Sequence, residues 1–154
     1  MAVPKPIRNA AGSYSGESTL HMPWMPEGQR LDAGPSKLHI EFDMHTKYAT
    51  VTYTWTYEKK EQEGTILIAS DDEGKDVEMG WSDSWHQSAG VLHLKGSVDK
   101  EEISCKGKYP AAEGPDWGWR ITLGGSGDKL TMQMYNAMPT GEEMLAVEAI
   151  YTKE

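Results

Sequence analysis

The ten residues 79–88, "MGWSDSWHQS", bring a carboxylate, an imidazole and three hydroxyls close together in the chain. These are the groups that general acid–base and nucleophilic catalysis use. Along an extended strand, Asp83 falls on one face between Trp81 and Trp85, and His86 falls on the opposite face. A carboxylate buried between two indoles has to be paired, hydrogen-bonded or protonated. Asp83 is therefore interpreted either as a structural hydrogen-bond acceptor or as a polar anchor for a ligand.

Ser84 and His86 stand two residues apart, so that on one strand face their side chains could touch. The surrounding residues show neither a nucleophile elbow nor a recognisable oxyanion hole. Polar residues on the outer face of a strand explain the pair equally well, and a Ser/His nucleophile is not predicted. An enzyme that uses Asp83 or His86 as a general acid or base within a cavity remains an alternative.

A second polar group, at residues 39–45, consists of His39, Glu41, Asp43 and His45, all on one face of an expected strand. Leu38, Ile40, Phe42 and Met44 alternate with them on the other face. Because the polar face is opposite the aliphatic one, an exposed polar stripe is the expected structure. The spacing also lacks the specificity of a zinc motif such as H-E-x-x-H. We predict no metal site and no cofactor.

A second tryptophan pair occurs in residues 114–123, "GPDWGWRITL". Trp117 and Trp119 share one strand face with Ile121, whereas Gly118 and Arg120 lie opposite. Even-spaced tryptophans form either a packed core wall or the lining of an aromatic cavity. The alternation sends Arg120 outward, although a β-bulge would turn it inward as a partner for an anion.

The leading functional hypothesis is a non-enzymatic protein that holds an apolar or aromatic small molecule inside a barrel. Its motivation is the pairing of tryptophans, together with methionines that adapt to irregular ligands. The residues predicted to line the ligand are Tyr53, Trp55, Trp81, Trp85, Trp117, Trp119 and Met132, with Asp83, His86 and Arg120 as polar anchors.

The elements that would position these residues are short strands. Clusters of turn-forming residues separate runs of about 7 to 12 residues with period-2 alternation. Residues 51–57, "VTYTWTY", are one example. About ten strands are predicted, with residues 142–151 the least certain, because their composition also suits a helix. So many antiparallel strands avoid exposed edges if the sheet closes into an up-and-down barrel. The prediction is one all-β domain, 1–154, with an amino-terminal extension (1–11) and a proline- and glycine-rich loop (23–35).

Bulk composition limits the partners. The formal net charge is −9, with 24 acidic and 15 basic residues, which disfavours nucleic acid and anionic membranes. The longest aliphatic run is only residues 66–69, and the amino end lacks the apolar region of a secretory signal. Cys105 stands alone and forms no internal disulfide, so we expect a cytoplasmic protein. Its oligomeric state, monomer or homodimer, is left open.

Several blocks resemble a bacterial family of unknown function with a calycin-like barrel, the architecture of lipocalins and fatty-acid-binding proteins. "GSYSG" (12–16) is similar to the Gly-x-Trp opening of calycins, with Tyr14 in place of the tryptophan. The blocks 15–28, 79–88, 114–123 and 146–151 resemble the family's recurring segments in the same order. The resemblance covers most of residues 12–152 and implies a ten-stranded barrel, but no activity.

Two further alternatives follow from the architecture. The haem-binding barrels typified by nitrobindin use a histidine late in the chain, whereas the last histidine here is His93, so His86 would have to serve instead. The prolines of the 23–35 loop replace the two-helix lid of fatty-acid-binding proteins, which argues against fatty acids. The third alternative is a filled barrel that acts as an interaction module through the loop containing Trp24.

Overall fold

The computed structural model describes residues 2–25, 30–86 and 90–154. These residues form one short 3-10 helix, η1 (Lys5–Ile7), and ten strands. The strands are β1 (Gly12–Met22), β2 (Arg30–Phe42), β3 (Tyr48–Tyr57), β4 (Lys60–Ser70), β5 (Asp76–Asp83), β6 (Leu92–Asp99), β7 (Glu102–Tyr109), β8 (Trp117–Ser126), β9 (Lys129–Ala137) and β10 (Glu143–Lys153).

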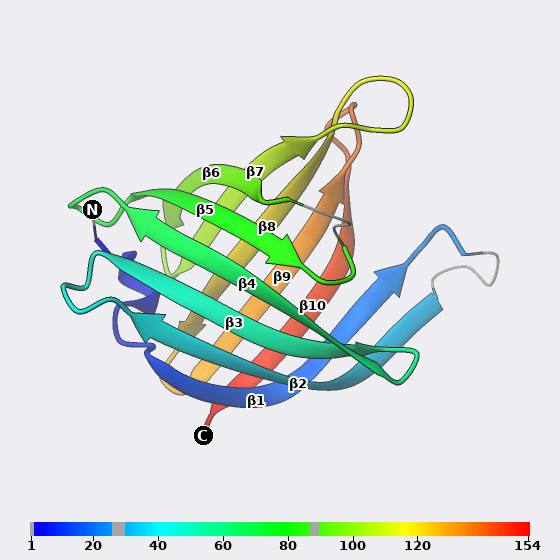
Figure 1. The fold of residues 1–154 in the computed structure, drawn as a ribbon. Coiled ribbons are helices and arrows are strands. Elements are labelled where there is room, and N and C mark those ends of the chain that lie inside the picture. The colour runs from blue at the N-terminus through cyan, green and yellow to red at the C-terminus, as the bar shows by residue number, and fades with distance from the viewer. Residues whose placement is uncertain (1, 26–29, 87–89) are drawn as a thin grey trace.

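The sheet is a closed barrel in which every strand pairs antiparallel with its neighbours in sequence. Closure comes from β1 and β10, which pair over Tyr14–Leu20 and Val147–Lys153 (Figure 1). Closure removes the open strand edges wherever neighbouring strands are paired. The predicted all-β, up-and-down barrel of about ten strands is confirmed, and so is the final strand in residues 143–153.

Alternation along the strands decides which side chains point inward. In β5 every second residue from Val77 to Asp83 is buried, and the residues between them are half-buried or exposed. The inward faces of the strands are packed with aliphatic, methionine and aromatic side chains, because removing apolar surface from water is favourable. Its largest fully buried members are Trp81, Tyr151, Ile7, Ile40, Ile66, Ile68, Met79, Leu94, Ile103, Ile121, Leu123 and Leu130.

The loop predicted at 23–35 is shorter than expected, because β2 already begins at Arg30. The first half of β2 pairs with β1, and the pairing with β3 starts only at Lys37. Pro35 is tolerated here because a proline needs no partner on a side where no strand pairs with it. Figure 1 shows this β1–β2 hairpin projecting at the end of the barrel away from the chain termini. Residues 26–29 of the predicted loop lie outside the described residues.

Met44 is a second departure from the predicted pattern. It was expected on the aliphatic face with Leu38 and Ile40, but β2 ends at Phe42 and Met44 lies in the following turn, 90% exposed. The alternation of inward and outward side chains no longer applies once the strand has ended and the chain turns.

The amino-terminal extension closes one end of the barrel. Val3 and Ile7 are buried in the core, and Ala2 pairs with Ser70 at the end of β4. The backbone N–H of Val3 also donates to the carbonyl of Thr46 at 3.3 Å. At the opposite end, here called the far end, β3, β5 and β7 finish, and β6 and β8 begin. Apolar side chains of this extension thus cover one end of the barrel.

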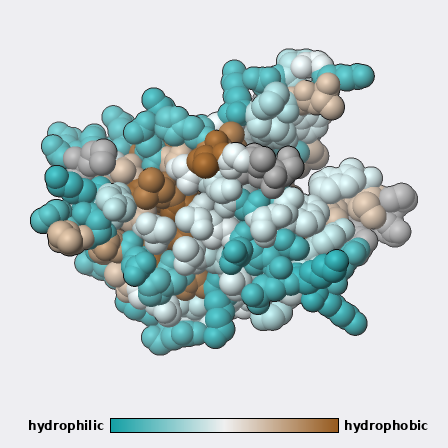
Figure 2. Space-filling view, in the orientation of Figure 1, coloured by the Kyte–Doolittle hydropathy of each residue, from teal (hydrophilic) through white to brown (hydrophobic). Residues whose placement is uncertain are grey.

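The outer surface is mostly hydrophilic, with small apolar patches on the face shown in Figure 2. The exposed large apolar side chains of the described residues include Trp24, Leu31, Leu67 and Val91. In the described residues, no helix has the length and apolar character needed to cross a membrane.

Candidate functional site

The carboxylate of Asp83 is the centre of a buried polar network at the far end. Its Oδ2 accepts hydrogen bonds from the Tyr53 hydroxyl at 2.7 Å and the Trp55 indole N–H at 3.2 Å. Its Oδ1 accepts from the backbone N–H groups of Trp85 at 2.8 Å and His86 at 3.1 Å. The His86 Nδ1 lies 3.3 Å from the same oxygen. An ionised carboxylate offers about four lone-pair sites, so the protein itself saturates Asp83.

These hydrogen bonds keep Asp83 ionised in a buried position. Burial by itself would raise the pKa of this carboxyl group, but the net pKa is lowered. The hydrogen bond from His86 and the charge of its ring when protonated, the Tyr53 hydroxyl and the Trp85 backbone N–H favour the carboxylate and outweigh burial. Of the two interpretations of Asp83, a structural acceptor is the one that this geometry describes.

Tyr53 extends the network to a third indole. Its hydroxyl accepts a hydrogen bond from the Trp81 N–H at 2.8 Å while it donates to Asp83. Burial, and then the neighbouring carboxylate, raises the pKa of Tyr53 well above its ordinary value, so the phenol keeps its proton. The side chains of β3 and β5 are thereby held together across β4.

Gly64 makes this arrangement possible. It lies on β4 in register with both Tyr53 and Asp83, between the two. A Cβ at this position would come within 2.1 Å of the Tyr53 hydroxyl oxygen. Only a residue without a side chain lets the phenol cross β4, and the sequence pattern does not reveal this role.

His86 occupies a different place from the one predicted. The alternation put it on the outer face, but β5 ends at Asp83, and the chain then turns. The turn brings the His86 side chain inward, where it is only 10% exposed. Because Nδ1 lies against the carboxylate of Asp83, the proton of the ring is held on Nδ1. The other nitrogen, Nε2, is buried and has no hydrogen-bond partner among the described residues.

Four indoles surround the imidazole of His86. The distances between its ring centroid and theirs are 4.9 Å for Trp85, 5.3 Å for Trp55 and Trp119, and 5.8 Å for Trp81. Trp81 and Trp119 stack on each other at 5.1 Å, with an angle of 6° between their planes. Trp85 packs edge-on against Trp55 at 5.6 Å. The histidine is thus held in an aromatic box by packing as well as by Asp83.

A pocket of about 180 Å³ opens beside this box, lined by Trp81, His86, Leu92, Tyr109 and Trp119. The Tyr109 hydroxyl donates to Asn136, which leaves the ring to form a wall. Trp119 Nε1, like His86 Nε2, is buried without a hydrogen-bond partner among the described residues. Leaving such a group unpaired costs about 1–3 kcal/mol. The lining therefore combines aromatic surface with two unsatisfied ring nitrogens.

Larger hollows occur elsewhere but are of a different kind. One of about 320 Å³ beside η1 is lined by surface lysines and the glycine-rich turn 125–127. Two others, of about 460 and 350 Å³, are grooves along the outside of the sheet. The described residues show no unsatisfied buried ring nitrogen in any of the three. The smaller pocket at the far end is the candidate site.

The residues predicted to line a ligand divide into three groups. Trp81, His86 and Trp119 line the pocket, and Leu92 and Tyr109 were missed. The alternation of residues 92–98 and 103–109 places Leu92 and Tyr109 on inward faces, so the sequence pattern could have identified both of them. Behind the pocket, holding Trp81 and His86 in place, lie Tyr53, Trp55, Asp83 and Trp85.

The remaining predicted residues do not line the pocket. Met132 is buried in the core, and Trp117 is half-buried at the start of β8. Arg120 faces outward as the alternation predicted, because the register of β8 runs without a bulge. Its Nε donates to Glu143 at 2.9 Å, and its guanidinium lies 4.1 Å from the centre of the Tyr135 ring.

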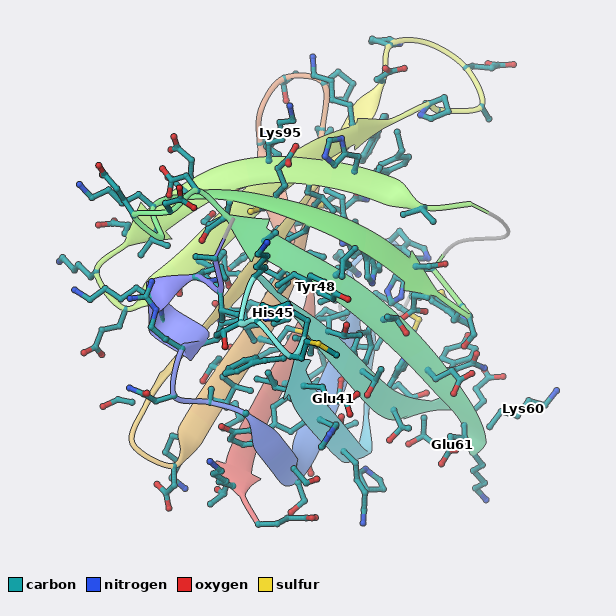
Figure 3. All side chains as sticks on the ribbon, turned by 60° about the vertical axis from the view of Figure 1, so that its left-hand side comes forward. Glu41, His45, Tyr48, Lys60, Glu61 and Lys95 are labelled. Carbon is teal, nitrogen blue, oxygen red and sulfur yellow. The ribbon has the colours of Figure 1, made fainter. Side chains whose placement is uncertain are left out.

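The polar stripe on β2 does not form a site. The carboxylate of Asp43 accepts backbone N–H groups of His45 and Tyr48 and so closes the β2–β3 turn. Glu41 on β2 and His45 in the turn after it are both exposed (Figure 3). Across residues 2–25, 30–86 and 90–154, no group of three or more His, Cys, Asp and Glu side chains could hold a metal ion.

Two other reactive side chains have structural partners. The Ser84 hydroxyl donates to the Gln62 amide oxygen at 2.8 Å and accepts the Glu63 backbone N–H, pointing away from His86. Burial raises the pKa of Cys105 to about 12, so its thiol is unreactive at neutral pH.

The comparisons with known proteins agree with this barrel. The model of a family described as "Protein of unknown function (DUF1579)" matches residues 8–153. The chain belongs to this family. No curated protein matches this DUF1579 chain. Among solved structures it is similar to the crystal structure of Rv2717c from M. tuberculosis, with a TM-score of 0.69 and 12% identity over 99% of each chain. At this identity the likeness extends to the fold alone.

Proposed function

We propose that this DUF1579 protein binds a small, mainly apolar aromatic molecule in the pocket at the far end of its barrel. One observation carries the proposal: two pocket-lining side chains, His86 and Trp119, have buried ring nitrogens with no partner among the described residues. Apolar pockets with a few polar fixtures are the usual form of small-molecule sites.

The size of the pocket limits the ligand. A cavity of about 150 Å³ accepts benzene, whereas sites for drug-sized ligands occupy about 300–1,000 Å³. At about 180 Å³, the pocket suits a single substituted ring. The core beneath it is filled by residues such as Met79 and Ile121, which leaves no channel for a fatty acyl chain among the described residues. Haem, a flat ring of four pyrroles, is likewise larger than this pocket.

Binding accounts for the site better than acid–base catalysis does. Asp83 already receives five hydrogen bonds from the protein and has no position left for a reacting proton. The Nδ1 of His86 is engaged by the same carboxylate. Nε2 is therefore the nitrogen of His86 that is left to meet a ligand. General acid–base catalysis needs a catalytic group within reach of the proton that it moves.

A pair of leucine variants tests the proposal. In Leu92→Trp the new indole fills the pocket, and binding of single-ring aromatic compounds should be lost. The matched control is Leu67→Trp, because Leu67 lies on the outside of β4 with 49% of its surface exposed. Ligand-detected NMR with benzene derivatives measures both. Equal binding by the two variants, or none by the unmodified protein, would contradict the proposal.

The barrel is further proposed to belong to the calycin group. Its support is the closed, antiparallel, up-and-down order of ten strands among the described residues. Membership would imply a common architecture with ligand carriers, without fixing the ligand.

A second candidate function is an interaction module. It is favoured by Trp24 and Leu31 near the tip of the β1–β2 hairpin, which are 63% and 56% exposed. Exposed aromatic side chains at a projecting hairpin are typical of contact surfaces. Analytical ultracentrifugation of the protein and of Trp24→Ser tests it. Self-association that Trp24→Ser removes would support the module, and a monomer at all concentrations would count against it.

A further inference from the structure

The two unsatisfied nitrogens of the pocket have opposite hydrogen-bonding roles. Asp83 Oδ1 lies 3.3 Å from Nδ1 of His86 and holds a hydrogen there, so that with a single hydrogen on the ring Nε2 is an acceptor. The Nε1 of Trp119 carries a hydrogen and can only donate. A ligand that satisfies both must therefore offer one donor and one acceptor.

The lining also favours a ligand without charge. It contains no lysine or arginine among the described residues, so a carboxylate would find no cation there. The buried carboxylate of Asp83 stands directly behind His86 and would repel an anion. An organic cation would be attracted to the indole faces but offers no acceptor to Trp119.

We infer that the ligand is a neutral single-ring molecule that carries a hydroxyl group, of the phenol class. This inference rests on the proposed function, because it specifies what the same pocket binds. A hydroxyl both donates and accepts, which matches Nε2 of His86 and Nε1 of Trp119. The ring fits a pocket of about 180 Å³ and packs against Trp81 and Tyr109.

Binding includes a small movement of the lining. Both nitrogens have almost no exposed surface, so a hydroxyl reaches them only after the rings of His86 and Trp119 part slightly. Trp81 is held by a hydrogen bond to Tyr53, and Asp83 holds His86, whereas the Trp119 indole N–H has no hydrogen-bond partner among the described residues. The indole N–H of Trp119 is accordingly the probe that reports on the ligand.

The experiment compares ligands of nearly equal size on the unmodified protein. Phenol, toluene, anisole, benzoate and tetramethylammonium are titrated while the ¹H–¹⁵N resonances of the indoles are recorded. Trp119 is assigned from the spectrum of Trp119→Phe. Phenol should bind at least about tenfold more tightly than toluene and shift the Trp119 resonance most, as one or two gained hydrogen bonds require. Anisole, which only accepts, should fall between them.

Two variants locate the effect. In His86→Phe and in Trp119→Phe a ring remains but one hydrogen-bonding nitrogen is lost, so the affinity of each variant for phenol should fall between the affinities of the unmodified protein for phenol and for toluene. If His86→Phe does not fold, Trp119→Phe and the ligand series still decide the matter. Equal affinities for phenol and toluene, or tighter binding of benzoate or tetramethylammonium, would overturn the hydroxyl inference and leave the proposed pocket intact. Absence of binding by all five compounds would overturn both.

Discussion

Tyr53 and Asp83 lie on strands that are not neighbours, yet the Tyr53 hydroxyl donates a 2.7 Å hydrogen bond to the Asp83 carboxylate across Gly64. The bond ties β3 to β5 over the intervening β4 at the far end of the barrel. Asp83 in turn accepts the backbone N–H groups of the turn that carries His86. The position of the imidazole in the pocket therefore depends on a glycine on the neighbouring strand, β4.

Gly64→Ala is the most direct test of that arrangement. The added Cβ would lie 2.1 Å from the Tyr53 oxygen and push the phenol off Asp83. Overpacking and a lost hydrogen bond to a charged group should together lower the free energy of unfolding by about 2–4 kcal/mol. Urea unfolding followed by tryptophan fluorescence measures the change.

Gly80→Ala provides the matched control for this variant. Gly80 lies on β5. A Cβ added there would lie 3.5 Å from its nearest neighbour, a side-chain carbon of Val91, which is an ordinary contact distance. Gly80→Ala should therefore change the free energy of unfolding by much less than Gly64→Ala does. If both alanines cost the same, the crossing of Tyr53 over Gly64 is not what stabilises the far end.

Asp83 should make the protein sensitive to acid. Its pKa is lowered in the folded protein from an ordinary 3.8, so the folded state holds the carboxylate more strongly than the unfolded chain does. That contribution is complete above the ordinary pKa and disappears as the pH falls through the lower folded value. Unfolding free energies measured from pH 7 to pH 2 should fall below about pH 4, and Asp83→Asn should flatten this part of the curve. An unchanged acid limb in the variant would show that other carboxylates cause it.

The sequence predicted inward faces well wherever a strand continued. Trp81, Asp83 and Trp119 were placed inside the barrel by alternation alone, because period-2 patterning is local. His86 was placed on the wrong face, because the end of β5 at Asp83 is set by backbone hydrogen bonds to a side chain and not by the pattern. Gly64 could not be assigned, since its role depends on the register of three strands, which sequence spacing does not reveal.

The buried thiol of Cys105 should resist alkylation. Burial raises its pKa to about 12, so almost no thiolate exists at neutral pH, and the sulfur is also covered by the core. Iodoacetamide at pH 7.5 should leave the folded protein unmodified for hours and label it fully in 6 M guanidinium chloride, as mass spectrometry would show. Rapid labelling of the folded protein would mean that the barrel opens often near β7.

Trp119 and Arg120 are adjacent on β8, but their side chains lie on opposite sides of the sheet. Trp119 lines the pocket, whereas Arg120 pairs with Glu143 outside the barrel at 2.9 Å. Arg120→Gln should therefore leave the affinity for phenol within about twofold of the unmodified protein, and it should cost at most about 1 kcal/mol of stability, as partly exposed ion pairs do. NMR titration and urea unfolding measure the two quantities. The register of β8 is continuous, so the Arg120 side chain is not turned inward. A large loss of affinity in Arg120→Gln would therefore place the site on the outer face.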